Sequence, residues 1–200
     1  MHDVDEVPVL LDFRAYIQSK VAIQDDLWQV MTEAMKVVKV HKGERLLEKG
    51  VVCKHIYFIY KGAFRFLYLK DEEEITTALY TKGVCMTNMK SLATLQPSSI
   101  IIQSLEDGII VRMGKEFLIQ LYKKATGLEA VGRVITEHMV AEDMEWKEMY
   151  TIYNPEQRYQ FLLKKSPEIL QKVPLQYVAS FLGMRRETLS RIRGRVSRPS

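Results

Sequence analysis

The sequence predicts an α+β protein in which a β-rich N-terminal part is followed by a helical C-terminal part. Between residues 37 and 113, short runs of β-branched and aromatic residues alternate with glycine-containing turns. This pattern is typical of an antiparallel β sandwich or barrel. From residue 127 onward, apolar residues recur instead at spacings of three and four, which is typical of helices.

The composition narrows the class of protein further. Of the 200 residues, 47% are hydrophobic and 27% are charged, as in an ordinary globular protein. The two cysteines, Cys53 and Cys85, do not suggest a disulfide framework, and the acidic N-terminus is unlike a secretory signal. The longest uncharged stretch, residues 91–105, is too short to span a membrane. We therefore expect a cytoplasmic protein without a membrane segment.

Residues 9–36 are expected to be helical, with Asp25 and Asp26 capping a helix. The apolar residues of that helix share one face: Leu27, Val30, Met31, Ala34 and Met35. Strands are expected at residues 37–40, 45–48, 55–60, 63–69, 75–80, 100–103 and 109–113. The acidic run 71–74 lies between two of these strands and is expected to be an exposed hairpin tip.

A single long helix is expected over residues 127–153, which contain no proline and no glycine after Gly132. At 1.5 Å per residue, this helix would be about 40 Å long. Such a helix either meets a copy of itself or lies against its own domain, and the pattern favours a dimer. The expected dimer interface is its apolar seam, which contains Val131, Ile135, Met139, Trp146 and Met149.

The C-terminal part carries most of the positive charge. Residues 155–200 hold ten basic and three acidic residues, for a net charge of +7, whereas the other 154 residues hold 19 basic and 22 acidic ones. A basic segment on a slightly acidic body indicates a polyanionic partner, although a solvated basic tail would have the same composition.

Within this basic part, residues 173–193 have the pattern of a helix-turn-helix. Val178, Ala179 and Leu182 would form the buried face of one helix, and Gly183 would supply the turn. Leu189 and Ile192 would pack the second helix. Its polar face would then suit the major groove of DNA: Arg186, Glu187, Ser190, Arg191 and Arg193. An ordinary helical hairpin with a charged exterior is the alternative.

Residues 186–192 resemble the recognition helix of the Crp/Fnr superfamily of bacterial transcription regulators. The β-rich segment with Gly43, Gly50 and Gly62 is similar to the cyclic-nucleotide-binding β-roll of that family. Asn154 and Pro155 lie where the family's DNA-binding domain begins. The resemblance implies three units: an N-terminal double-stranded β-helix or jelly roll with preceding helices at residues 1–126, a long dimerisation helix at 127–153, and a helix-turn-helix domain without a clear wing at 154–200.

The resemblance implies a homodimeric regulator that binds an inverted repeat in double-stranded DNA, and it allows for a contact with RNA polymerase. We expect half-sites with G·C pairs, close to the TGTGA type that similar helices of the family read. Arg195 and Arg198 are expected to contact only phosphates. The expected DNA-binding residues are Arg185, Arg186, Glu187, Thr188, Ser190, Arg191 and Arg193.

The chain departs from the family pattern where cyclic AMP would bind. The cyclic-AMP-binding members carry a Gly-Glu pair for the ribose and an Arg-Ser pair for the phosphate. Here, no glutamate occurs between Glu74 and Glu106, and no arginine between Arg65 and Arg112. A buried phosphate without a cation is costly, so we expect that cyclic-AMP binding has been lost, and the effector is unknown.

No other motif indicates catalysis or a cofactor. Cys53, His55, Cys85 and His41 could ligate a metal or haem, but they lack the repeated spacing of such sites. No phosphate-binding or nucleophile motif occurs. We therefore expect no enzyme, no metal and no cofactor. The alternative function is that of a degenerate β-roll module which acts through protein–protein contacts and binds little DNA.

Overall fold

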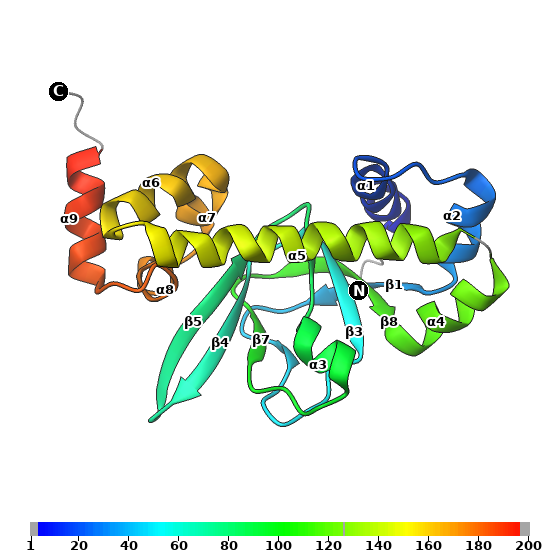
Figure 1. Ribbon diagram of the computed structural model, residues 1–200, viewed down its shortest axis with the longest axis horizontal. Coiled ribbons are helices and arrows are strands. Elements are labelled where there is room, and N and C mark those ends of the chain that lie inside the picture. Colours follow the sequence, from blue (N-terminus) through cyan, green and yellow to red (C-terminus); the bar gives the residue numbers. More distant parts are fainter. Residues whose placement is uncertain (1–3, 126, 197–200) are drawn as a thin grey trace.

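The computed structural model describes residues 4–125 and 127–196 and confirms the α+β class (Figure 1). Two four-stranded antiparallel sheets form the β-roll, with strand orders β1-β8-β3-β6 and β2-β7-β4-β5. The strands of the first sheet are β1 (Met35–Val40), β8 (Gly108–Gly114), β3 (His55–Lys61) and β6 (Cys85–Met86). The strands of the second are β2 (Arg45–Leu47), β7 (Ile101–Ser104), β4 (Phe64–Lys70) and β5 (Glu73–Tyr80).

The two sheets pack face to face because alternate residues of their strands are apolar and point inward. Ile59 of β3, Phe64 of β4, Ile102 of β7 and Ile110 of β8 are fully buried in one core. A short helix, α3 (Met89–Thr94), follows β6 and leads back toward β7. The helix α4 (Lys115–Lys124) follows β8 and is the last element before the long helix.

The N-terminal helix is shorter and more interrupted than the expected stretch 9–36. The chain forms α1 (Glu6–Gln18) and α2 (Asp25–Thr32), and Met35 already begins β1. The expected cap is also wrong, because Gln24 precedes α2 and its side chain forms no capping hydrogen bond. The helical spacing that includes Met35 is overridden by antiparallel pairing with β8, in which Met35 lies opposite Met113.

The acidic run 71–74 forms the hairpin tip only in part. Asp71 and Glu72 make the turn, with φ angles of 49° and 67°, and the strand β5 begins at Glu73. Two consecutive positive φ angles give the turn the twist that an antiparallel hairpin requires. Glu74 is already part of the sheet and forms an ion pair with Arg65.

The long helix α5 (Leu128–Ile152) runs alongside the β-roll and leads to the C-terminal helices (Figure 1). It ends where Asn154 caps the next helix. The Asn154 side chain accepts from the Gln157 backbone at 3.0 Å, and the Gln157 side chain accepts from the Asn154 backbone at 3.0 Å. Pro155 occupies the first turn, where its missing N–H costs nothing.

Four short helices follow α5 in the described part of the chain: α6 (Pro155–Lys165), α7 (Pro167–Lys172), α8 (Leu175–Phe181) and α9 (Arg186–Val196). Their core is not separate from the β-roll, because Ala63 and Leu79 of the roll and Met149 of α5 are buried in the same cluster. No helix of the described residues combines the length and apolarity needed to cross a bilayer.

Candidate functional site

The helices α8 and α9 form a helix-turn-helix whose turn requires glycine. Gly183 has a φ angle of +66°, and a Cβ at this position would lie 3.1 Å from a guanidinium nitrogen of Arg158. The turn is closed by the Met184 N–H, which donates to the Ala179 carbonyl at 3.0 Å. The residues that the pattern predicts to be buried are buried: Val178, Ala179, Leu182, Leu189 and Ile192.

The polar side chains expected to contact DNA all lie at the surface of this unit. Glu187 lies three and four positions before Ser190 and Arg191, and Gly194 lies four and three positions after them, so the four residues share the side of α9 away from Leu189. The exposed set is Arg185, Arg186, Glu187, Thr188, Ser190, Arg191 and Arg193. Within residues 4–125 and 127–196, none of these seven forms an ion pair, so their charges are available to a partner.

Of the two arginines expected to contact phosphates, Arg195 lies at the surface of α9. Arg195 forms an ion pair with Glu156 at 3.0 Å, and its side chain remains 67% exposed. An exposed ion pair of this kind contributes little to stability and does not prevent a phosphate contact. Arg198 lies outside the described residues.

Arg158 of α6 joins the helix-turn-helix to the long helix, a role that its place in the sequence does not indicate. Its guanidinium donates to the carbonyls of Tyr150 at 3.0 Å, Tyr153 at 3.0 Å and Leu182 at 3.1 Å. Tyr150 and Tyr153 lie at the end of α5, whereas Leu182 precedes the turn. One side chain therefore ties three backbone segments together. Only its position four residues after the cap Asn154 could have drawn attention to it.

We expect Arg158→Ala to lower the free energy of unfolding by about 2–4 kcal/mol, because it leaves three carbonyls without a charged donor. Urea denaturation followed by circular dichroism measures this change. Arg133→Ala is the matched control, since Arg133 pairs only with the exposed Glu137 one helical turn away, and we expect it to cost under about 0.5 kcal/mol. Equal losses for both variants would contradict the role of Arg158.

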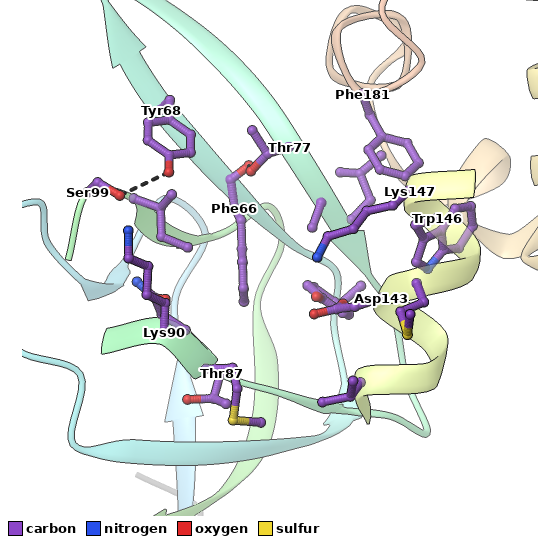
Figure 2. A pocket seen from close by; sticks show the side chains of 18 of the residues that line it. Phe66, Tyr68, Thr77, Thr87, Lys90, Ser99, Asp143, Trp146, Lys147 and Phe181 are labelled. Carbon is purple, nitrogen blue, oxygen red and sulfur yellow. Dashed lines mark hydrogen bonds between the residues drawn. The ribbon is translucent and has the colours of Figure 1, made fainter. Parts of the chain in front are cut away.

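A cavity of about 460 Å³ lies where the β-roll, α5 and α8 meet (Figure 2). Its walls are partly apolar and aromatic, with Phe66 from β4, Trp146 from α5 and Phe181 from α8. Polar groups also face it: the Tyr68 hydroxyl and the Ser99 hydroxyl, which hydrogen-bond each other at 2.9 Å, and Asp143. The cavity can therefore hold a small molecule of mixed polarity.

Two lysines line this cavity from different elements. Lys90 comes from α3 and Lys147 from α5, and Figure 2 shows both side chains at the cavity. Burial raises the pKa of Asp143 above its ordinary value, and this effect is opposed by Lys147 and by a hydrogen bond from Tyr80. The cavity therefore contains a carboxyl group and two cationic groups, and the two lysines are more than fifty positions apart in the sequence.

Comparison with known proteins supports the resemblance at the level of the fold. Residues 37–125 match the cyclic nucleotide-binding domain family. FixK2 from Bradyrhizobium japonicum is similar in structure with a TM-score of 0.69 at 14% identity, over 81% of this chain and 84% of that chain. A regulator from Eubacterium rectale assigned to the Crp/Fnr family gives 0.61 at 17% identity, over 85% and 82%. The chain has the fold of the Crp/Fnr regulators.

A further relative is the c-di-GMP responsive global regulator CLP of Xanthomonas campestris, with a TM-score of 0.64 at 15% identity. The similarity covers 86% of this chain and 91% of CLP. No curated protein sequence matches the chain. CLP and the Eubacterium rectale protein are described as regulators.

Of the two serines that stand where the family has its Arg-Ser pair, Ser99 faces the cavity but Ser98 does not. Ser98 is buried, and its hydroxyl accepts from the Asn88 amide at 2.7 Å and donates to the Ile100 carbonyl at 2.6 Å. The expectation that no cation is near is wrong, however, because Lys90 and Lys147 line the cavity. The absence of arginine between Arg65 and Arg112 does not exclude lysines that α3 and α5 supply.

Two residues of the seam expected to form the dimer interface, Val131 and Met149, are buried in the chain's own core instead. Val131 is 3% exposed and packs with the β-roll and α1, and Met149 is fully buried with the C-terminal helices. Trp146 lies edge-on to Phe161 at 5.4 Å and to Phe181 at 5.3 Å between ring centroids. The remaining seam residues, Ile135 and Met139, are partly buried against the β-roll core.

This correction has a simple physical reason. Helical periodicity shows that one face of a helix is covered, but it does not show whether the covering surface belongs to the same chain or to a copy. In the Crp/Fnr fold of this chain, α5 buries its most apolar face internally. The exposed apolar residues of α5 are on another side: Val140, Met144 and Ile152.

The cysteines and histidines do not converge in the described part of the chain, where no group of three or more potential metal ligands occurs. Cys53 and Cys85 are both buried and free. Burial raises the pKa of the Cys85 thiol to about 12, so it remains protonated. These residues belong to the packing of the β-roll.

Proposed function

We propose that this chain is a sequence-specific, DNA-binding transcription regulator that acts as a homodimer in the cytoplasm. The observation that carries the proposal is the helix α9, which presents six of the seven exposed polar residues, in a helix-turn-helix that Gly183 and Arg158 help to hold together. Three of the residues of α9 on this surface are Arg186, Arg191 and Arg193. A surface of this shape and charge fits the major groove of DNA.

The proposed readout follows from the chemistry of the exposed side chains. An arginine fork pairs best with O6 and N7 of guanine, and a glutamate accepts from N4 of cytosine. With Arg186 and Glu187 in the first turn of α9, G·C pairs are expected in each half-site. A dimer would bind an inverted repeat with half-site centres about 10–11 base pairs apart.

The proposed dimer uses the exposed side of α5 rather than the buried seam. Val140 is 43% exposed and Met144 is 57% exposed, and they lie one helical turn apart. Both residues also border the cavity. A second copy packed along this side of α5 would bury them and cover the mouth of the cavity at the same time.

The cavity is the proposed effector site of the regulator. Its two lysines and its aromatic walls suit a small anion with an apolar part. Binding of the effector would change the relative orientation of the two DNA-binding units through α5. The dimer that is bound to DNA would then contact RNA polymerase.

Selection of bound sites from random duplex DNA, with and without cell extract, tests this function. We expect enrichment of an inverted repeat with G·C pairs in both half-sites, and an affinity that falls steeply with salt. The degenerate β-roll module is the outcome if no sequence is enriched and the salt dependence is weak. In that case the regulator proposal is wrong.

We expect no binding of cyclic AMP at micromolar concentration. Lys90 and Lys147 are both exposed side chains, and the Ser98 hydroxyl is already paired inside the fold. A micromolar dissociation constant needs about −8 kcal/mol, and a lysine is a point charge that lacks the fork with which an arginine binds two oxygens of a cyclic phosphate, so the cavity suits other small anions better. Isothermal titration calorimetry that gave a micromolar dissociation constant would contradict this expectation.

A further inference from the structure

The strands β4 and β5 form a ribbon whose two faces have different neighbours. Phe66 and Tyr68 of β4 are on the face that lines the cavity. Arg65 precedes Phe66 by one position, and successive residues of a strand point to opposite faces. Arg65 and Thr76 contact α8 of the helix-turn-helix instead.

Arg65 forms the centre of the contact between the ribbon and α8. Its guanidinium carbon lies 3.9 Å from the centroid of the Tyr177 ring, and the residue is only 2% exposed. The guanidinium is held in this position by Glu74 and by Gln103, whose side-chain oxygen accepts at 2.7 and 2.9 Å. A cation over an aromatic face is attracted most strongly where water is excluded, as it is here.

A hydrogen bond completes the contact at the edge of the sheet. β5 is the last strand of its sheet, so the N–H groups on its outer side have no neighbouring strand. The Thr76 N–H donates to the Ser180 hydroxyl of α8 at 2.9 Å. The helix thus covers an edge that would otherwise be open to pairing with another chain.

The same helix also reaches the cavity. Phe181, the last residue of α8, lines the cavity, and its carbonyl accepts from the Tyr150 hydroxyl of α5. α8 and α9 share a core with buried Val178 and Leu189, so they move as one unit. None of the contacts of α8 with the ribbon uses the exposed side chains of α9.

We propose that Arg65, Tyr177 and Ser180 are positioning residues that set the orientation in which α9 meets DNA. Through them, the β4–β5 ribbon and Phe181 couple the cavity to that orientation. This inference rests on the proposed function. It adds that the outer face of the β4–β5 ribbon sets the orientation of the DNA-binding unit, while the inner face of the same ribbon lines the cavity that would hold the effector.

Tyr177→Leu tests the positioning role, with Tyr177→Phe as its matched control because phenylalanine keeps the ring under Arg65. We expect Tyr177→Leu to weaken binding to the selected inverted repeat about tenfold, because a fixed orientation makes the second half-site contact effectively intramolecular. Binding to DNA with one half-site should remain unchanged. Tyr177→Phe should bind both as the wild type does, and fluorescence anisotropy at fixed salt measures both affinities.

Amide hydrogen exchange at Thr76 reports the contact independently of DNA. We expect the exchange rate of this amide to rise about tenfold in Tyr177→Leu and in Ser180→Ala, since its acceptor is moved or removed. The amide of Ile110, in the centre of the other sheet, should stay protected in both variants and so reports an intact fold. If Tyr177→Leu fails to fold, Ser180→Ala carries the measurement.

The outcomes separate the two proposals. Unchanged protection of Thr76 together with an unchanged ratio of inverted-repeat to half-site affinity in Tyr177→Leu would overturn the positioning role. A parallel loss on both DNAs would also overturn it, because orientation affects only the paired site. A third outcome is that the wild type selects no sequence, while the Thr76 amide exchanges faster in the variants. In that case the proposed function is wrong, and so is the positioning role in DNA binding. The contact between α8 and the ribbon is still confirmed.

Discussion

Replacing Arg186 by alanine is expected to weaken binding to the best inverted repeat by about 1–3 kcal/mol and to relax the preference at one base pair. Arg186 begins α9, and the first turns of a recognition helix are the part that reaches base edges. Arg191 lies one and a half turns further on, exposed and without an ion pair among the described residues, so Arg191→Ala should cause a loss of similar size. Competition binding against single-base variants of the site measures both effects.

Arg195→Ala is the control for this experiment. Arg195 is near the other end of α9, beside Glu156, where a contact to phosphate is expected. Its loss should weaken all sequences alike and lower the slope of log affinity against log salt by about one. Equal losses on specific and random DNA for Arg186→Ala, or selected half-sites without a G·C pair, would show that α9 does not read bases.

Met144→Asp is expected to convert the protein to a monomer at tens of micromolar and to reduce affinity for the inverted repeat at least tenfold. Met144 is exposed on α5, so a charge there costs the single chain under about 0.5 kcal/mol of stability but would be buried between two copies. Sedimentation velocity measures the assembly, and urea denaturation at low protein concentration measures the stability.

Ile135→Asp is the contrasting variant, because Ile135 packs against the β-roll of its own chain. We expect it to lower the free energy of unfolding by about 3 kcal/mol, since it places an unpaired charge in a core. A wild type that is monomeric at tens of micromolar would contradict the proposed dimer. A folded Ile135→Asp monomer beside an unchanged Met144→Asp dimer would restore the buried seam as the interface.

The β-roll and the helix-turn-helix could be predicted from the sequence because both depend on local periodicity. Strands with alternating burial and turns with glycine are visible in a short window, and so are the buried Leu189 and Ile192 of α9. The prediction of one helix over residues 9–36 was wrong because it, too, depended on local periodicity alone. A window that includes Met35 shows helical spacing but does not show that β8 is available as a strand partner.

The cavity and the interdomain contacts could not be predicted, because they join residues far apart in the chain. Lys90 and Lys147 line the same cavity only because the β-roll packs against α5. Arg158 contacts Leu182 across 24 positions, and Arg65 meets Tyr177 across more than one hundred. Tertiary packing, and not periodicity, assigns these side chains their roles.

The core that Ala63 and Leu79 share with Leu182 and Phe181 limits how the chain can be recombined. A hybrid protein that joined this β-roll to the C-terminal helices of another regulator would leave the outer edge of β5 bare, together with an apolar surface that no helix is shaped to fill. Its two halves would fold poorly or associate with other chains. Exchange of whole domains with proteins of similar fold therefore requires matched changes on both sides of this contact, so we expect the two halves to evolve together and not as interchangeable parts.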